Sequence, residues 1–363
     1  MKNLIIPLLI VCLLLGACAM KEETPTTIPT TEPTTTVPTT EATEPPTTVP
    51  VLRYRHPLNG TLMEQPWTGR PVAVVLNNIK SAMPQHGVGD ADILYEIETE
   101  GGITRCLGIY SDVSGISAIG PIRSARTFFN NVALSYDAPI IHCGGSVRGR
   151  KGGYADSSDR ISGWAHIDQV ANGKFFYRDA DRKAAGYAYE HRLFSTGALL
   201  TEGLQKKNYS DATERSCDFG LNFDSAVTLA GSPANTVTVS FLGRKTTTMT
   251  YNPATGLYEA AQYDAPYIDG NTGNVITFKN VMILTTSQWK KDDGEYLRSY
   301  YDLESSGNGL LAIDGQIVPI MWTKDALRTS FSYTLMDGTP ITLAEGHTYI
   351  AITSTKATPV AYS

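Results

Sequence analysis

Apolar positions divide the chain into three regimes. An uninterrupted apolar run covers residues 4–15, residues 24–50 carry few apolar side chains, and from residue 51 short apolar runs alternate with polar and glycine-rich turns. The first run is too short for a helix that crosses a bilayer, which needs about 20 apolar residues. The pattern therefore predicts a short leader, a stretch without secondary structure and a folded body of about 310 residues.

The first half of the body alternates apolar runs with helical and glycine-rich segments. Strands are predicted at residues 71–77, 91–98, 104–110 and 139–143. The second and third of these strands are expected to pair as a hairpin, because Gly101 and Gly102 between them permit a tight reversal.

One helix is predicted in this half, over residues 124–136. Phe128, Phe129 and Val132 recur there at helical spacing and can share one apolar side. Ser124 is its expected N-cap, since serine side chains accept hydrogen bonds from the first free backbone N–H groups of a helix.

The second half of the body is nearly all β-branched or aromatic runs separated by turns. Extended segments are predicted at residues 226–229, 236–241, 247–251, 275–285, 310–313, 317–322 and 350–353. The body is therefore expected to be α+β. An N-terminal domain over residues 51–210 would have mixed sheets with helices on one side, and a C-terminal domain over residues 211–363 would be mostly antiparallel β.

The leader ends in a pattern that lipoprotein signal peptidases read. Leu15, Gly16 and Ala17 precede Cys18, so residues 1–17 are predicted as a lipoprotein signal peptide and Cys18 as the lipid-bearing first residue of the mature chain. An ordinary secretory signal cut near the same place is the alternative. The prediction is a chain that is lipid-anchored on the extracytoplasmic face of the cell membrane.

Threonine and proline dominate the stretch that follows Cys18. Residues 18–50 are predicted to be a disordered tether, because such a composition buries too little surface to offset its ordering entropy. Proline favours extended conformations, so the tether acts as a spacer between the anchor and the body.

Charge and cysteine content exclude some classes of function. The formal net charge of −6 argues against nucleic-acid binding, which needs a basic excess. The body keeps Cys106, Cys143 and Cys217, whose spacing matches no zinc site, and neither a metal nor a cofactor is expected. A Cys106–Cys143 disulfide and buried free thiols both remain open.

Three glutamates in alternation mark the first candidate site. Period-two geometry places Glu96, Glu98 and Glu100 on one face of their strand, opposite Tyr95 and Ile97. Crowded carboxylates raise one another's pKa toward values useful in acid–base chemistry. The alternative is a solvated strand face with Arg105 as a cross-strand partner.

The second candidate is the segment Gly120-Pro121-Ile122-Arg123-Ser124-Ala125-Arg126. Free backbone N–H groups at the start of the predicted helix, beside Arg123 and Arg126, would suit a carboxylate or a phosphate. An internal ion-pair network with Glu96 and Glu100 is the alternative.

The third candidate is His142, at a strand end before a glycine turn that contains Ser146. Arg148 stands where a nucleophile elbow needs glycine, so the pattern gives little support to Ser146 as a nucleophile. A mobile loop is expected at residues 149–153. The histidines show no metal-binding spacing and are expected to be structural.

The sequence resembles the YerB-like lipoproteins of Gram-positive bacteria, a family of unknown function with N- and C-terminal parts. The resemblance rests on Arg70-Pro71-Val72-Ala73-Val74, Pro84-Gln85, Tyr95-Glu96, Glu100-Gly101-Gly102-Ile103-Thr104-Arg105, Gly120 to Arg126, and His142 with Gly145-Ser146. It implies an extracytoplasmic lipoprotein with a three-layer α+β N-terminal region. Glu190-His191-Arg192 departs from the Pro-His-Asn-like segment of the family.

Two functions are compatible with these patterns. The favoured one is an envelope lipoprotein without catalytic activity that binds a cell-wall fragment or a wall-synthesis protein. Its charged cleft would be formed by Glu96, Glu100, Arg105, Arg123, Ser124, Arg126, His142 and Ser146. The alternative is an enzyme acting on cell-wall or glycan material, with Glu96 or Glu100 and His142 as acid and base.

Overall fold

The computed structural model describes residues 52–146, 165–211, 217–242, 245–292 and 296–363. Residues 50–363 form one compact unit. The predictions for the leader, Cys18, the tether, Arg148 and residues 149–153 lie outside the described residues. Among the described residues, no helix is both long and apolar enough to cross a membrane.

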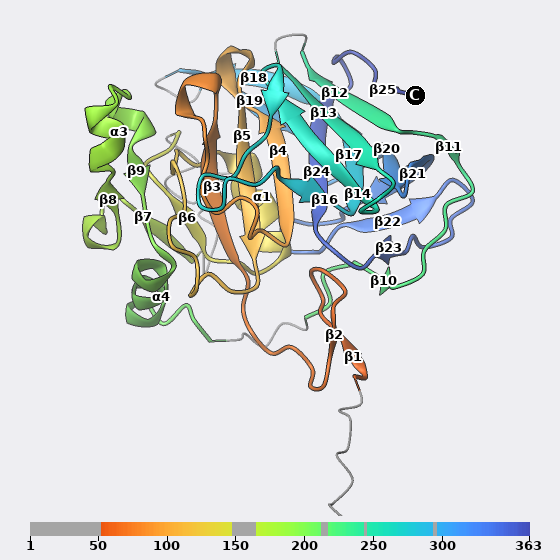
Figure 1. The fold of residues 1–363 in the computed structure, drawn as a ribbon, viewed down its shortest axis with the longest axis horizontal. Coiled ribbons are helices and arrows are strands. Elements are labelled where there is room, and N and C mark those ends of the chain that lie inside the picture. Colours follow the sequence, from red (N-terminus) through yellow and green to blue (C-terminus); the bar gives the residue numbers. More distant parts are fainter. Residues whose placement is uncertain (1–51, 147–164, 212–216, 243–244, 293–295) are drawn as a thin grey trace, which may run out of the picture. The chain divides into compact units, whose positions relative to one another are not determined.

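A large mixed sheet forms the centre of this unit (Figure 1). Its strands run in the order β11 (Ser232–Pro233), β21 (Gln316–Thr323), β20 (Ser306–Ile313), β17 (Asn280–Thr286), β24 (Thr348–Ser354), β4 (Ile93–Glu98), β5 (Thr104–Tyr110), β3 (Val72–Asn78), β6 (Ile140–His142) and β7 (His166–Asp168), with β22 (Ser332–Leu335) beside β21. The sheet therefore takes strands from both halves of the body.

Strand direction places many strand ends at one edge of this sheet. β17, β24 and β4 are parallel neighbours, and so are β3, β6 and β7. β5 lies antiparallel between β4 and β3, so the two parallel groups point the same way. The carboxyl ends of six strands and the amino end of β5 consequently share an edge, which we call the carboxyl edge.

A second, antiparallel sheet covers one face of the large sheet. It contains β15 (Ala265–Pro266), β14 (Leu257–Gln262), β13 (Lys245–Asn252), β12 (Thr236–Phe241), β25 (Ala361–Tyr362) and β16 (Thr277–Phe278). Burial alternates along β12 and β14, as expected for strands with one covered face. Val237, Val239 and Met249 share a core with Val74 and Leu94 of the large sheet.

Helices complete the layers. α1 (Thr127–Ser135) packs Phe128, Phe129 and Val132 against the face that carries Tyr95 and Ile97. α4 (Gly197–Lys206) belongs to the other core, where its apolar side chains join those of β6 and β7. These layers confirm the mixed α+β fold.

The remaining elements are short. They are β1 (Tyr54–Arg55), β2 (Leu62–Met63), β8 (Tyr177–Arg178), β9 (Leu193–Phe194), β10 (Phe223–Asp224), β18 (Gln288–Asp292), β19 (Leu297–Tyr301), β23 (Leu343–Ala344), α3 (Ala180–Ala184) and the 3-10 helices η1 (Lys80–Ala82), η2 (Glu100–Gly102), η3 (Gly173–Phe175) and η4 (Tyr189–His191). β8, β9, α3 and α4 lie together beside β6 and β7, at the left of Figure 1.

The hairpin prediction is confirmed, since β4 and β5 pair antiparallel across η2. Two local predictions are wrong. Residues 226–229 form no strand. The helix begins at Thr127 with Arg126 as its N-cap, not Ser124, because Arg126 itself is still extended, with a φ of −133° and a ψ of 160°.

Candidate functional site

Most of the polar residues predicted from the sequence lie at the carboxyl edge. β3 ends there with Asn77 and Asn78, β6 with His142, and β7 with Asp168, while β5 begins there with Thr104 and Arg105. In open sheets with parallel strands, ligands commonly bind outside this edge. The edge is therefore the place to examine for a site.

β3 and β6 pair only over their first residues, up to Val74 and Ile141. Beyond this point the segment 120–126 lies between the two chains and bonds to both. The Arg123 N–H donates to the Val75 carbonyl at 2.9 Å, and the Cys143 N–H donates to the Arg123 carbonyl at 3.0 Å. Gly120 has a φ of +156°, and a Cβ there would lie 2.7 Å from the Phe194 ring. This close packing fixes where Arg123 and Arg126 leave the backbone.

Arg126 and Glu100 form a bidentate ion pair at this edge. Arg126 Nε lies 2.9 Å from Glu100 Oε1, and Nη2 lies 2.7 Å from Oε2. The side chains are 5% and 23% exposed. Burial would raise the pKa of Glu100, but the hydrogen bonds and charge of Arg126 outweigh it and lower that pKa. The predicted internal ion pair between these two residues is thus present.

Two further arginines, Arg105 and Arg298, lie beside this pair. Arg105 Nη1 donates to the Ser124 carbonyl at 2.7 Å, and Arg298 Nη1 lies 3.6 Å from Glu100 Oε2, where it shares the carboxylate with Arg126. Burial first, and then the charges of Arg126 and Arg123, lower the pKa of Arg105 well below its usual value. The Glu100 charge acts in the opposite direction and does not compensate.

Arg123 completes what we call the arginine cluster, which consists of Arg105, Arg123, Arg126 and Arg298. Among the described residues, the buried Nε atoms of Arg105 and Arg123 have no hydrogen-bond partner, and neither side chain has an ion pair. Burial lowers the pKa of Arg123. The negative charge of the exposed Glu190 acts in the opposite direction. Arg105 and Arg123 therefore add positive charge in partly buried surroundings without an ion pair among the described residues.

Glu96 is not part of this cluster. It points to the other face of the large sheet, where Oε1 lies 2.6 Å from Lys245 Nζ, and both side chains are 2% exposed. Its oxygens also accept hydrogen bonds from Asn78, Thr104, Thr247 and Tyr349. Burial would raise the pKa of Glu96, but the charge of Lys245 and the hydrogen bonds from Lys245, Thr104 and Tyr349 lower it. Glu96 thus belongs to a saturated internal network.

The alternation predicted for the three glutamates holds only within the strand. Glu96 lies opposite Tyr95 and Ile97, as expected. Glu100 lies beyond the end of β4, in η2, where Gly101 has a φ of +77° and turns the chain. Because of this turn, the Glu100 side chain contacts Arg126, whereas the Glu96 side chain lies on the other face of the sheet.

His142 and Ser146 are buried beside the arginine cluster. The His142 side chain is 0% exposed, and its Nδ1 donates to the Gly144 carbonyl at 2.8 Å. His142 Nε2 therefore accepts from His166 Nδ1 at 3.1 Å. Burial lowers the pKa of His142. Ser146 is 2% exposed. These contacts fit the structural role expected for the histidines.

The cysteines of the body are free thiols. Cys106, Cys143 and Cys217 form no disulfide, so of the two alternatives for Cys106 and Cys143 the structure shows free thiols. Burial raises the pKa of Cys106 and of Cys143. The described residues contain no group of three or more histidine, cysteine or acidic side chains that could hold a metal ion.

Sequence reasoning missed Lys245 and Arg298. Burial along β13 alternates from Lys245 to Thr247 and Met249, so period-two spacing was the available signal that Lys245 points into the core. Arg298 lies in β19, and no local sequence pattern indicates its contact with Glu100, because the tertiary fold brings the two residues together.

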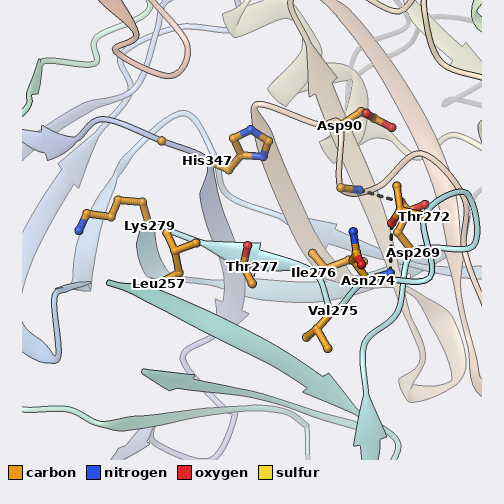
Figure 2. Close-up of a pocket in the computed structure, with 12 residues that line it drawn as sticks. Asp90, Leu257, Asp269, Thr272, Asn274, Val275, Ile276, Thr277, Lys279 and His347 are labelled. Atoms are coloured by element: carbon orange, nitrogen blue, oxygen red, sulfur yellow. Dashed lines mark hydrogen bonds between the residues drawn. The ribbon is translucent and has the colours of Figure 1, made fainter. Parts of the chain in front are cut away.

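A separate hollow of about 360 Å³ opens at the opposite edge of the large sheet (Figure 2). It lies before the first residues of β4, β17 and β24, with Asp90 and Asp269 at one end and Lys279 at the other. Asp269 accepts the Gly89 N–H at 2.9 Å, and Lys279 is paired with Asp314. Burial, and then the charge of Asp269, raise the pKa of Asp90. None of the sequence-predicted site residues lines this hollow.

Comparisons with known proteins agree with the fold. Residues 58–210 match the family described as "Protein of unknown function (DUF3048) N-terminal domain", and residues 237–350 match its C-terminal domain. The chain is 29% identical over 275 residues to "Putative lipoprotein YerB" of Bacillus subtilis (strain 168), covering 74% of this chain and 78% of that protein.

A solved structure extends the agreement to three dimensions. The crystal structure of the YerB protein from Bacillus subtilis matches with a TM-score of 0.70 and 26% sequence identity, over 85% of this chain and all of that chain. The two domain matches, the relative and the structure all point to the family that the sequence motifs resemble. The chain therefore belongs to the YerB-like family, which is defined by the DUF3048 N- and C-terminal domains.

Proposed function

We propose that this protein is an extracytoplasmic lipoprotein, anchored through Cys18, that binds an anionic cell-envelope ligand or protein partner at the arginine cluster. The chain shares its family with the relative that bears the name "Putative lipoprotein YerB", which supports the anchor. A cell-wall fragment or a wall-synthesis protein is the expected partner, because peptide carboxylates and phosphates are the groups that guanidinium pairs grip in two-point contacts.

The observation that carries the binding proposal is the charge imbalance at the carboxyl edge. Arg105 and Arg123 have buried Nε atoms without a hydrogen-bond partner among the described residues. An uncompensated buried charge is costly, and an anion beside these two side chains would offset that cost. Arg123 and Arg298 are only partly buried, so these two members of the cluster are the ones that a ligand can reach, and Arg123 is the one of them without an ion pair to Glu100.

The catalytic alternative finds no support in the geometry. It needs Glu96 or Glu100 to meet His142 at one reacting centre. Glu96 is paired with Lys245 on the other face of the sheet, Glu100 is paired with Arg126, and His142 is fully buried against His166.

The test combines a defined anion with capture from membranes. Calorimetric titration of the full-length chain in detergent with inorganic phosphate should show saturable binding that weakens as ionic strength rises. Arg123→Gln should weaken this binding about tenfold, since it removes a charge-assisted hydrogen bond. The matched control is Arg53→Gln, an exposed arginine away from the edge, which should bind like the wild type.

The same variants test whether a membrane or wall component binds at the arginine cluster. In chemical crosslinking of intact membranes, Arg123→Gln should lose the species that the wild type and Arg53→Gln both capture. If all three proteins bind phosphate equally and capture the same species, the arginine cluster is not the recognition surface.

A further inference from the structure

A second cavity, of about 450 Å³, lies where the two family regions meet. Lys80, Met83 and Pro84 contribute to it from the segment after β3, and the β14–β15 hairpin, residues 257–266, supplies the opposite wall. Its volume is in the range of small-molecule sites. We call it the seam cavity.

The walls of the seam cavity are apolar and held in place. The Tyr263 hydroxyl donates to the Asn78 carbonyl at 2.5 Å, and the Tyr267 hydroxyl donates to Gln85 Oε1. Because both hydroxyls are bonded to the protein, the rings offer their carbon surfaces to the cavity. Pro84 and Pro266 add further rigid apolar surface. Such a lining favours a ligand with an apolar, flat or branched body.

One polar group in this lining is not satisfied. Gln262 is the last residue of β14, is 5% exposed, and contacts Met83 Sδ through Nε2 at 3.7 Å. Its Oε1 is buried and has no hydrogen-bond partner among the described residues. A buried acceptor without a donor is costly, and the last torsion of glutamine is soft enough to turn the amide toward a ligand. A ligand with an N–H or O–H group could therefore donate a hydrogen bond to Gln262 Oε1.

The mouth of the cavity is positively charged. Lys80 is exposed and has no ion pair among the described residues, and no acidic side chain lines the cavity. An anionic group on the ligand would complement Lys80 without meeting a like charge.

We propose that the seam cavity binds an N-acylated amino acid with an apolar side chain, either free or as the C-terminal residue of a peptide. Its side chain packs against Tyr263 and Tyr267, its amide N–H donates to Gln262 Oε1, and its carboxylate lies beside Lys80. Neither the arginine cluster nor an anchor at Cys18 takes part, so this site is independent of the proposed function.

Matched probes test each contact. The full-length chain in detergent is titrated calorimetrically with N-acetylphenylalanine, with its carboxamide and with its N-methyl analogue. We expect the N-methyl analogue to bind about tenfold more weakly, because it lacks the donor for Gln262. The carboxamide should bind about threefold more weakly, because it loses the solvent-exposed charge contact between its carboxylate and Lys80. A tetrapeptide that ends in phenylalanine separates the two sources: binding equal to the single residue indicates a peptide terminus, and exclusion indicates a free acylated amino acid.

Variants assign the contacts to residues. Gln262→Met keeps the shape and removes the acceptor, so it should fold normally and no longer distinguish the N–H probe from the N-methyl probe. Lys80→Gln should erase the preference for carboxylate over carboxamide. The control Lys183→Gln changes an exposed lysine of α3 and should keep both preferences.

The outcomes that overturn the proposal are specific. Absence of saturable binding at millimolar probe, or a Gln262→Met protein that still prefers the N–H probe, removes the seam cavity as the site. Arg123→Gln should leave N-acetylphenylalanine binding unchanged; if it abolishes that binding, the probe binds at the arginine cluster instead. The two proposals therefore fail on different variants.

Discussion

Glu96 and Lys245 join the two family regions through one buried ion pair. Glu96 Oε1 lies 2.6 Å from Lys245 Nζ, with 2% of each side chain exposed, and the two residues come from β4 and β13. The pair lies behind the seam cavity, since Lys245 Nζ is 5.4 Å from the centre of the Tyr263 ring that lines it. Its integrity therefore bears on both the fold and the cavity.

Removing the charge of Glu96 should destabilise the protein strongly. Glu96→Gln leaves the Lys245 ammonium buried without an anion, which costs about 3–5 kcal/mol. The double variant Glu96→Gln with Lys245→Met removes both charges and should recover part of that loss. Urea denaturation of the wild type, the two single variants and the double variant measures the coupling. Strictly additive losses would contradict the pair.

Glu100→Gln and Arg123→Gln should change anion binding in opposite directions. Glu100 supplies a carboxylate that two members of the arginine cluster contact, at 2.7 Å from Arg126 and 3.6 Å from Arg298. Removing its charge should tighten phosphate binding about fivefold, by a Coulomb contribution of about 1 kcal/mol. It should also lower the free energy of unfolding, because Arg126 loses its partner. If Glu100→Gln weakens phosphate binding as Arg123→Gln does, the charge surplus is not what attracts the anion.

Gly120→Ala should destabilise the segment that carries the arginines. A Cβ at Gly120 would lie 2.7 Å from the Phe194 ring and 2.9 Å from the Leu193 carbonyl oxygen, at a φ of +156°. Overpacking of this kind costs about 1–3 kcal/mol. Gly115→Ala is the matched control, since a Cβ there meets nothing within 4 Å. Equal melting temperatures for the two variants would show that the segment relaxes freely.

Buried histidines should make the protein less stable as pH falls from 7 to 5. Burial lowers the pKa of His142 below the usual 6.5, and burial with the neighbouring His142 charge lowers that of His166 to about 4. Between these values and 6.5 the unfolded chain binds more protons than the folded one, so stability rises with pH and is lost on acidification through this window. His166→Gln should flatten the slope of unfolding free energy against pH. An unchanged slope would mean that other groups cause it.

Cys18→Ser should release the protein from membranes if Cys18 carries the anchor. Serine cannot form the thioether on which the lipid is built. Fractionation followed by mass measurement of the intact chain should show a membrane-bound, lipid-modified wild type and an unmodified variant that leaves the membrane fraction. Retention of the variant on membranes would point to another means of attachment.

Local periodicity accounts for what the sequence could predict of this fold. β3, β4, β5 and β6 were expected within about two residues of their observed ends, because each is a continuous buried run between turn residues. The opposite faces of Glu96 and Tyr95 follow from the same alternation. The glycines of η2 indicated a reversal, but the direction in which Glu100 leaves it depends on the positive φ of Gly101.

Long-range pairing accounts for what could not be predicted. Lys245 is 149 positions after Glu96 in the sequence, and no local sequence pattern indicates that the two residues form an ion pair. Arg126 became the N-cap because segment 120–126 pairs with β3 and with the residues after β6, and the chain is still extended at Arg126. The short strands β7, β8 and β9 carry too few residues to show a period.

The place of β24 governs the order in which this molecule can assemble. Thr348–Ser354, fully buried, inserts parallel between β4 and β17, although it follows every other described strand of the large sheet in the sequence. Until it arrives, β4 presents an open hydrogen-bonding row that invites pairing with another chain. The large sheet is thus continuous only when β24 is in place, and a truncation before residue 348 should yield an aggregating fragment instead of a smaller folded protein.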